Sequence, residues 1–368
     1  MRKIEPTLTK KLFNLDYDPK KIFAIDPLLV NKYTKLVEHT AKLAYLNKDY
    51  LLFFRGQCQD FKSKTGTSTF YPSIYRGEYV SSKELSYLFD LLNRACKKLV
   101  HIFKLNRMEG RGELRRKKYI QWSMLQHYEV CKTPLLDFTH SLRVACSFAQ
   151  CKNHDEYGYV YVFGFPYITN RISINSEHDI VNVRLLSISP PDALRPYFQE
   201  GYLAGTTDIT FDYDQKIELD FRNRLIMKFK IPNNNSFWGK EFHRIPDKLL
   251  FPRGDKILKL CETLEVDIKK DLQPGQLGVF LEEWSELEDI LKKRATGFQK
   301  RIYSLRQSIR ILFKNELVDR KTYILIDELR KFRNKVVHEP KEIDQKDLDD
   351  YLKKIKEIKK LLRNKNFK

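Results

Sequence analysis

Three residues near the C-terminal end of the sequence have the side chains that metal-independent cleavage of RNA requires. Arg333 and Asn334 are followed after three residues by His338, in a segment with the composition of a helix that Pro340 is expected to end. An arginine can hold a phosphate through two parallel hydrogen bonds, and a histidine can exchange a proton near neutral pH. These three residues are therefore our first candidate catalytic group.

The helix that carries this group cannot bring its three side chains together alone. Asn334 and His338 are four residues apart and share one face, whereas Arg333 points about 100° away from Asn334. A structural alternative also stays open, because Glu328, Arg330 and Arg333 have the spacing of a helical charge ladder. The pattern thus indicates either a nuclease site or a helix end stabilised by charge.

The composition favours a folded protein with a polyanionic partner. The chain has 368 residues, 42% of them hydrophobic, and a net charge of +20. Such a charge suggests nucleic acid, although many of the lysines could instead be solvated residues of a lysine-rich sequence. Basic residues concentrate at Arg111–Lys118 and Lys353–Lys368. Scattered cysteines fit no zinc pattern, so we predict no metal, and the lack of a signal peptide or long apolar run predicts a soluble, cytoplasmic protein.

The order of apolar patterns predicts a mixed α/β part (α+β or α/β) followed by an all-α helical bundle. We expect a helical lead-in over residues 1–48, a mixed α/β domain over 49–275 and a bundle over 276–368. The expected strands are 50–55, 157–165, 181–188 and 224–232. The expected helices are 28–46, 82–103, 120–128, 141–151, 281–316 with a break near Thr296-Gly297, 321–338 and 345–363.

The mixed α/β part contains a series of different short motifs, one after another along the sequence. They are Phe54-Arg55-Gly56-Gln57, Tyr71–Arg76, Gln126-His127-Tyr128, Thr133–Thr139, Ala145–Ala149, Arg195–Tyr202 and Ile245–Pro252. Together they resemble the bacterial FRG domain, which is named after its phenylalanine-arginine-glycine signature. Glu129 departs from the family pattern, because a glycine is usual at this position. The resemblance implies an FRG domain but not a particular reaction.

Arg55 and Gly56 are the candidate anion-binding residues of this domain. An arginine at the end of an apolar strand can clamp an anion, and a neighbouring glycine lets a ligand approach the backbone. The alternative is a buried arginine that pairs with Asp137 and joins two motifs. Asp137 and Thr139 are also suited to a turn that caps the next helix.

The same part of the chain is similar to ADP-ribosyltransferases in the order of its motifs. A strand ending in Arg55-Gly56, a Ser/Thr-rich loop and the later pair Gln199-Glu200 follow one another as in those enzymes. This resemblance implies NAD as the cofactor, held by the arginine, with the glutamate stabilising a ribosyl cation. His127 and Tyr128 are candidates for the same site, or are core residues at the end of an apolar helix.

The C-terminal bundle resembles the HEPN superfamily, in which Arg, Asn and His residues form a ribonuclease motif. Arg333, Asn334 and His338 match that motif, and the resemblance implies a homodimer in which two copies line one cleft. His338 would then transfer a proton during attack of a ribose 2′-OH on the adjacent phosphate. Arg333 would stabilise the phosphate charge, and Asn334 would position the backbone or the histidine.

We therefore expect a conflict- or defence-type protein with one of three activities. In the first, the HEPN-like bundle is a metal-independent endoribonuclease that needs no cofactor, and the FRG domain senses a trigger or restrains it. In the second, the FRG domain is an NAD-using, ADP-ribosyltransferase-like enzyme and the bundle only dimerises. In the third, the chain binds nucleic acid without chemistry. RNA is the expected partner and a homodimer the expected assembly.

Overall fold

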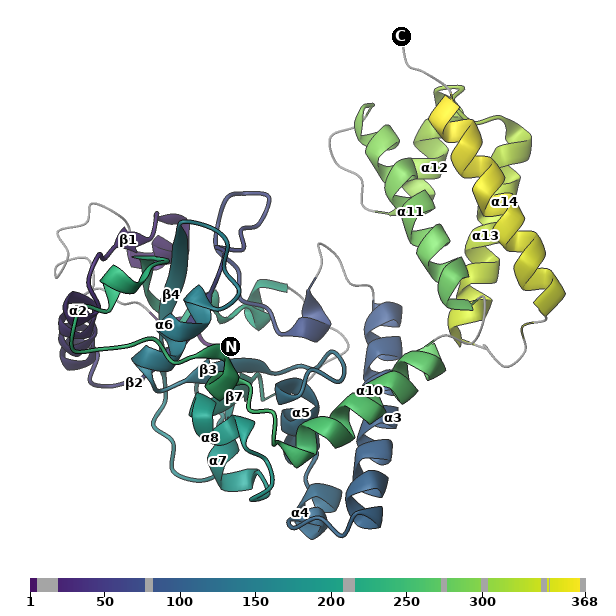
Figure 1. The fold of residues 1–368 in the computed structure, drawn as a ribbon. Helices are drawn as coiled ribbons and strands as arrows, with labels where there is room; N and C mark the ends of the chain where they lie inside the picture. Colours follow the sequence, from purple (N-terminus) through teal and green to yellow (C-terminus); the bar gives the residue numbers. More distant parts are fainter. Residues whose placement is uncertain are drawn as a thin grey trace. The chain divides into compact units, whose positions relative to one another are not determined.

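The chain forms two compact units, an αβ unit and a helical unit (Figure 1). Contacts divide it into Met1–Val266 and Asp267–Lys368. The first unit is built on an eight-stranded mixed sheet with helices, and the second on helices, so the predicted fold class is confirmed. The predicted boundary at residues 275/276 lies outside the described residues. The computed structural model describes residues 1–4, 19–76, 82–207, 216–272, 277–298, 304–338, 343 and 345–364.

The sheet of the first unit is mixed, although only one of its strand pairs among the described residues is parallel. Its strand order is β1-β8-β4-β2-β3-β7-β6-β5. β1 runs parallel to β8, and the other neighbouring strands are antiparallel. The strands are β1 (Leu28–Leu29), β2 (Leu51–Gln57), β3 (Leu136–Thr139), β4 (Tyr157–Phe165), β5 (Ile172–Asn175), β6 (Ile180–Arg184), β7 (Gly201–Gly205) and β8 (Leu225–Pro232).

The core of the sheet is aromatic. β4 is an almost continuous apolar run, as expected of a strand with both faces covered, and its predicted bounds are confirmed. Phe53 of β2 packs edge-to-face on Phe138 of β3, with ring centroids 6.5 Å apart. Phe138 also contacts Phe163 and Phe165 of β4, at 5.1 and 4.9 Å. These rings fix β2 and β3 beside each other, which is where the Arg55 and Asp137 motifs meet.

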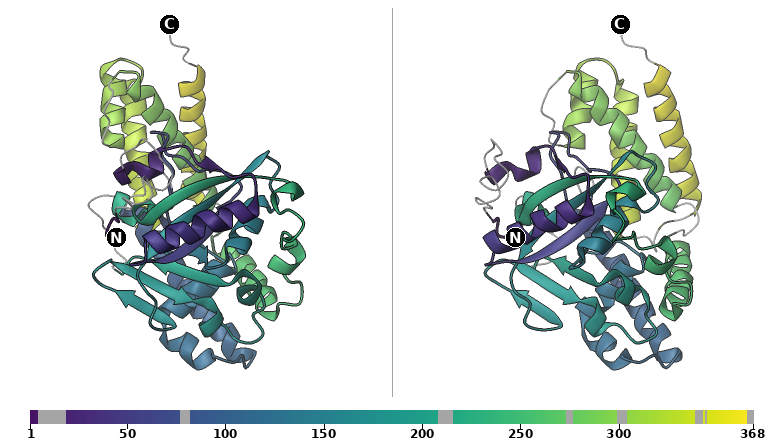
Figure 2. Two further views of the ribbon diagram at one scale, coloured as in Figure 1. Left: turned by 90° about the vertical axis from the view of Figure 1, so that its left-hand side faces the viewer. Right: turned by 60° about the vertical axis from the view of Figure 1, so that its left-hand side comes forward.

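Helices and short 3-10 turns surround the sheet. α6 packs on β2 and β4, and α2 lies along the sheet in Figure 2, where it is purple. The α-helices of this unit are α2 (Tyr33–Leu46), α3 (Ser82–Leu105), α4 (Arg111–Arg116), α5 (Lys118–His127), α6 (Leu142–Gln150), α7 (Leu185–Ile188), α8 (Arg195–Gln199), α9 (Asp247–Leu250) and α10 (Lys256–Leu272), the last of which crosses the division between the units. The 3-10 turns are η1 (Pro19–Ala24), η2 (Ser73–Tyr75), η3 (Lys216–Leu219), η4 (Phe221–Arg224) and η5 (Asn235–Phe237).

Three sequence predictions about this unit are wrong in detail. Residues 28–29 form a strand beside β8, so the helix expected from Leu28 begins at Tyr33. Residues 185–188 form α7 instead of the end of a strand, because β6 stops at Arg184. Asp137 lies in strand β3 instead of a turn, and Ser141 rather than Thr139 caps α6, by accepting a hydrogen bond from the Val144 amide.

The second unit contains α11 (Leu277–Thr296), α12 (Leu305–Lys314), α13 (Arg320–His338) and α14 (Gln345–Asn364). The predicted break at Thr296-Gly297 is confirmed, since α11 ends at Thr296. One shared apolar cluster holds the helices together, including Phe332 of α13, which stacks on Tyr351 of α14 at 3.9 Å. Pro340 lies outside the described residues. Within the described part of the chain, each helix is too short or too polar to cross a lipid bilayer.

Candidate functional site

Strand β2 positions Arg55 and Gly56, and Gly56 is required by the packing of α6. A Cβ atom at Gly56 would lie 1.8 Å from the carbonyl oxygen of Ala145 in α6. The close approach to Gly56 is thus made by the helix backbone, which differs from our expectation that a ligand makes it. The glycine of the signature leaves room for α6 to pack directly on strand β2, next to Arg55.

Arg55 is a half-buried cation that joins two motifs through a carbonyl group. Its Nη1 donates to the backbone oxygen of Asp137 at 2.6 Å, so the predicted link between these residues is made, but to the main chain. Its Nε has no hydrogen-bond partner among the described residues. Burial lowers the pKa of Arg55 to about 10, with a partial offset from the Asp137 carboxylate. Arg55 therefore keeps its positive charge at neutral pH.

The Asp137 carboxylate contacts the end of α5. Its Oδ1 lies 3.5 Å from Nδ1 of His127, and its Oδ2 accepts a hydrogen bond of 2.8 Å from Nε2 of Gln126. Gln126 is fixed in turn, because its Oε1 accepts hydrogen bonds from the hydroxyls of Thr133 and Ser73. Burial would raise the pKa of Asp137, but the contact with His127, Arg55 and Gln126 outweighs it, and the net pKa is lowered. The carboxylate is thus ionised.

A small cavity of about 200 Å³ lies against these groups. It collects five of the seven residues that the sequence predicted for the FRG domain, namely Arg55, Gly56, His127, Asp137 and Gln199. The other lining residues are Phe54, Gln126, Glu129, Phe138, Thr139, Phe148, Arg195, Gly201 and Phe251. Motifs about 145 residues apart in the sequence therefore meet at one place.

The remaining two predicted residues lie elsewhere. The Tyr128 hydroxyl donates to Oδ2 of Asp255 at 2.8 Å inside the unit, and burial together with Asp255 raises its pKa. Tyr128 is thus a core residue. Glu200 has an exposed side chain, a left-handed backbone (φ 45°) and a carbonyl that accepts from the Thr139 hydroxyl at 3.2 Å. Neither residue lines the small cavity.

The backbone conformation at Glu129 explains why a glycine is usual at this position. Its φ is 58°, in the left-handed region that residues with a Cβ atom disfavour. We expect Glu129→Gly to raise the free energy of unfolding by up to about 1 kcal/mol, because relief of this strain outweighs the greater chain entropy of glycine. Chemical denaturation compares the two proteins. A loss of stability in the variant would show instead that the 3.8 Å contact of Glu129 with Arg195 matters more.

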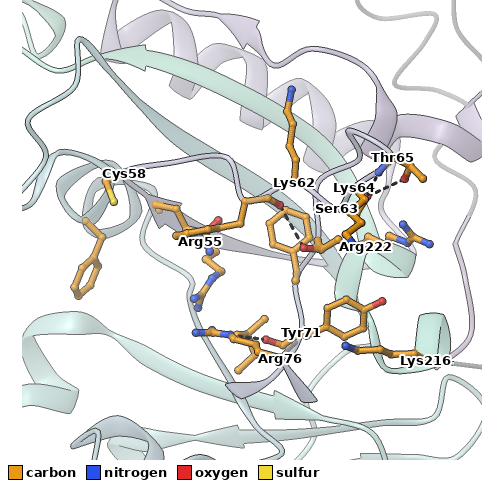
Figure 3. Close-up of a pocket in the computed structure, with 17 residues that line it drawn as sticks. Arg55, Cys58, Lys62, Ser63, Lys64, Thr65, Tyr71, Arg76, Lys216 and Arg222 are labelled. Atoms are coloured by element: carbon orange, nitrogen blue, oxygen red, sulfur yellow. Dashed lines mark hydrogen bonds between the residues drawn. The ribbon is translucent and has the colours of Figure 1, made fainter. Parts of the chain in front are cut away.

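Figure 3 shows a larger cavity, of about 930 Å³. It shares Arg55, Gly56 and Phe148 with the small one. Six cationic side chains line it, and none of the lining residues that the structure describes is acidic. The lining consists of Arg55, Gly56, Gln57, Cys58, Phe61, Lys62, Ser63, Lys64, Thr65, Thr69, Phe70, Tyr71, Arg76, Leu136, Phe148, Lys216 and Arg222. We call it the basic cavity.

A tight loop after β2 brings two lysines to the basic cavity. The Ser63 amide donates to the Thr67 carbonyl at 2.8 Å and the Gly66 amide to the Ser63 carbonyl at 2.9 Å. Gly66 has φ 77°, which suits glycine in such a turn. Lys62 and Lys64 are both carried by this folded loop and have exposed side chains. The loop therefore presents positive charge to solvent-filled space.

A buried carboxylate joins the loop to the opposite wall. Oδ1 of Asp220 accepts hydrogen bonds of 2.9 Å from the backbone amides of Phe70 and Arg222. Its Oδ2 lies 3.6 Å from Nε of Arg222. Asp60 lies 3.9 Å from Nζ of Lys62. Asp26 also lies 3.8 Å from Nζ of Lys62, and the Asp137 carboxylate acts on Arg55 and Arg76. These four carboxylates are fewer than the six cations that line the cavity.

Sequence reasoning missed most of the basic cavity. Of its six cations only Arg55 was a candidate site residue, although Arg76 belongs to the Tyr71–Arg76 motif. The lysines Lys62 and Lys64 stand in the Ser/Thr-rich loop that follows Arg55-Gly56, and this adjacency was the available signal. The sequence contained no such signal for Lys216 and Arg222, because they belong to η3 and η4, more than 150 residues after Lys62 and Lys64.

In the helical unit, α13 carries the predicted ribonuclease residues. Arg333 and Asn334 are half-buried, and the side chain of His338, the last residue of α13, lies outside the described residues. Of the predicted ladder residues, Arg330 forms an ion pair, with Asp327 at 2.9 Å, and Asp327 also contacts Lys331 at 3.2 Å. Nε of Arg333 is buried without a hydrogen-bond partner in the described ranges. Arg333 is thus outside that ladder.

Comparison with protein families identifies one part of the chain. Residues 51–158 match the FRG domain, so the first unit contains an FRG domain at these residues. The match includes the Arg55, His127 and Asp137 motifs and ends before Gln199. No curated protein matches the chain. No solved structure matches it either.

Proposed function

We propose that the first unit binds a phosphate-bearing nucleotide in the basic cavity. The observation that carries this proposal is the charge of the cavity, with six lysines and arginines around about 930 Å³ and no acidic lining residue in the described chain. Guanidinium and ammonium groups are the usual protein ligands of phosphate oxygens.

The size and the aromatic side chains of the cavity favour a nucleotide over a free phosphate ion. Pockets of roughly 300–1,000 Å³ hold molecules of nucleotide size. Phe61, Phe70, Tyr71 and Phe148 line the basic cavity beside the cations. Aromatic faces stack on nucleobases, which adds affinity that inorganic phosphate cannot gain. A dinucleotide such as NAD, with two bases and a diphosphate, is therefore the first ligand to test.

Binding, rather than ADP-ribosyl transfer, is the activity that this geometry favours. The transferase reading needs a glutamate in the ligand site, but the carboxylate expected for that role, Glu200, is exposed and lines neither cavity. Under our proposal the FRG domain acts as a nucleotide sensor, as in the first of the three activities expected from the sequence. NAD is then a ligand of the protein and not necessarily a substrate for group transfer.

Loss of the two loop lysines should weaken nucleotide binding. We expect the double variant Lys62→Gln/Lys64→Gln to bind NAD about tenfold more weakly than wild type, because two phosphate-facing charges are removed. The matched control is Lys35→Gln/Lys42→Gln, which removes two exposed charges from α2, away from the cavity. Isothermal titration at low and high salt gives the affinities. Equal loss in both double variants would mean that only the net charge of the protein matters, and it would refute the proposal.

A second candidate function is RNA cleavage by the helical unit. The specific observation in its favour is that Arg333 lies outside the Asp327 charge ladder and has an unpartnered Nε among the described residues, so its guanidinium is free of that structural role. Arg333, Asn334 and His338 would act as the resemblance to HEPN ribonucleases implies, in a homodimer with RNA as substrate. This reaction requires no cofactor. A nucleotide in the first unit would then act as the trigger, and a role in conflict or defence rests on analogy alone.

His338→Ala tests this second function. We expect it to reduce cleavage of labelled RNA at least about 100-fold, since general acid–base catalysis contributes on that order. Lys335→Ala is the control, because Lys335 is an exposed residue of the same helix. Assays with and without NAD show whether a nucleotide is needed. If His338→Ala cleaves like wild type, these residues are structural and the ribonuclease proposal fails.

A further inference from the structure

A dense positive charge lies on helices α3 and α4 of the first unit, outside both cavities. Residues 94–118, all of which the structure describes, contain ten lysines and arginines and two glutamates, so their net charge is +8, compared with +20 for the whole chain. No residue of this segment lines the small cavity or the basic cavity. Nine of the ten cations are exposed, and five of these nine are arginines. We call the exposed cations between Arg94 and Lys118 the helical basic surface.

Helix α3 holds part of this surface in one stripe. Arg94, Lys97 and Lys104 follow one another at intervals of three and seven residues, which places them on one face of the helix. The opposite face is buried and consists of Leu85, Phe89, Leu92, Cys96, Leu99 and Phe103. Ten residues of helix rise about 15 Å, and the phosphates of one duplex strand are about 3.4 Å apart along the duplex axis. The stripe therefore spans about four phosphates of a strand.

Helix α4 continues the surface beyond the end of α3, and it packs on both α3 and α5 (Figure 1). The carboxylate of α4, Glu113, is held by a cation from another segment, because Nη2 of Arg171 donates to its Oε1 at 3.0 Å. The same oxygen lies 4.0 Å from Nζ of Lys117. Glu109, the second carboxylate, is exposed just before α4. Two carboxylates are thus set against the nine exposed cations and Arg171.

The side chains of residues 94–118 favour a nucleic-acid duplex over a lipid membrane or a single strand. Helices that lie on membranes present large apolar side chains beside their cations, but Leu105 is the only exposed large apolar residue of this segment. Proteins bind single strands by stacking bases on aromatic rings, and Phe103, the only phenylalanine, tyrosine or tryptophan of the segment, is buried. A duplex keeps its bases stacked inside and carries one phosphate per about 1.7 Å of its axis, so cations alone can bind it.

We infer that the helical basic surface binds the phosphate backbone of a nucleic-acid duplex. Lysine and arginine side chains donate to phosphate oxygens there and read neither the bases nor the sugars, so binding is independent of sequence. This inference does not rest on nucleotide binding in the basic cavity, because the surface and the cavity share no residue. The first unit thus has two separate places for phosphate, one for a nucleotide and one for a polymer.

Fluorescence anisotropy of the full-length protein with a labelled DNA duplex of about 24 base pairs tests the inference. DNA is the probe because the second candidate function would cleave RNA. The affinity of the wild type should fall steeply with salt, with a slope of about 5 or more in a double-logarithmic plot. We expect the variant Lys97→Gln/Lys104→Gln/Arg115→Gln/Lys118→Gln to bind at least about 30-fold more weakly at about 0.1 M salt, and its slope to be smaller by about 3.

Two controls separate this surface from the rest of the positive charge. The matched variant is Lys32→Gln/Lys48→Gln/Lys240→Gln/Arg253→Gln, which removes the same charge from exposed residues of the first unit outside α3 and α4. The second control is Lys62→Gln/Lys64→Gln, which alters the basic cavity. Both should bind the duplex within about threefold of wild type, because charges beyond a Debye length are screened. Circular dichroism verifies that each variant is folded.

Several outcomes would overturn the inference. Equal loss in the α3–α4 variant and its matched control would mean that only net charge matters, and loss in Lys62→Gln/Lys64→Gln would place the duplex at the basic cavity. Tighter binding of single-stranded DNA, or of phosphatidylserine vesicles, would identify another partner. An RNA duplex of the same length should bind within about tenfold of DNA, and a larger preference would show that the sugar is read.

A second measurement needs no variant. An amine-acetylating reagent, read by mass spectrometry, reports the accessibility of each lysine in the wild-type protein with and without the DNA duplex. The duplex should protect Lys97, Lys104 and Lys118 and leave Lys32 and Lys48 as reactive as before. Unchanged acetylation of the first three lysines in the presence of bound duplex would contradict the inference even if the fourfold variant did not fold.

Discussion

Replacing Gly56 with alanine is expected to lower the free energy of unfolding by about 3 kcal/mol or more. The added Cβ atom would lie 1.8 Å from the Ala145 carbonyl oxygen, a contact that only a shift of α6 or β2 can relieve. Overpacking of a core commonly costs about 1–3 kcal/mol, and a clash with backbone is at the upper end, because no side chain can rotate away. Chemical denaturation followed by circular dichroism measures the loss.

Gly112→Ala is the matched control for this substitution. Gly112 lies in α4, and a Cβ atom there would meet nothing within 4 Å. Alanine is the better helix former, so this variant should gain up to about 1 kcal/mol. The same chemical change is thus expected to act in opposite directions at the two positions. Equal stability of Gly56→Ala and wild type would show that β2 and α6 are not packed as described.

Replacing Arg55 with glutamine is expected to weaken NAD binding about 100-fold. Arg55 lines both cavities and is half-buried, so its charge is partly shielded from solvent. Removing a hydrogen-bonded charge from a binding site costs roughly 2–5 kcal/mol. Arg55→Lys should recover only part of the affinity, because an ammonium group cannot both donate to the Asp137 carbonyl and bind phosphate through a second nitrogen. Titration calorimetry provides the dissociation constants.

Arg143→Gln controls for the loss of an arginine–carbonyl hydrogen bond. Nε of Arg143 donates to the His243 carbonyl at 2.8 Å, but Arg143 lines neither cavity. This variant should bind NAD like wild type. Weaker binding in Arg143→Gln to the same degree as in Arg55→Gln would attribute the effect to general loosening of the fold, and the assigned role of Arg55 would be wrong.

The elements with strong periodic or apolar patterns could be predicted from the sequence. β4 and the break after Thr296 were placed correctly because a continuous apolar run and a change of composition are local signals. β3 was missed because it has four residues, includes a charged aspartate and follows Pro134. Its strand geometry comes from pairing with β2 and β7, which lie far away in the sequence.

The candidate site was predictable in its parts but not in its contacts. The motifs with Arg55, His127 and Asp137 were singled out, and the small cavity collects them. The atoms that meet were not predictable, since Arg55 contacts the Asp137 carbonyl and His127 contacts the carboxylate. The cations of the basic cavity were hidden among 68 lysines and arginines, because side chains that converge from separate loops leave no spacing signal.

The location of the phosphates of a bound nucleotide tests the central claim most directly. A crystal structure of the protein soaked with NAD, at a concentration near the measured dissociation constant, would show it. Our account predicts diphosphate density within hydrogen-bonding distance of Arg55 and of at least one of Lys62, Lys64, Lys216 and Arg222. A basic cavity that stays free of nucleotide while NAD binds at another place would contradict it.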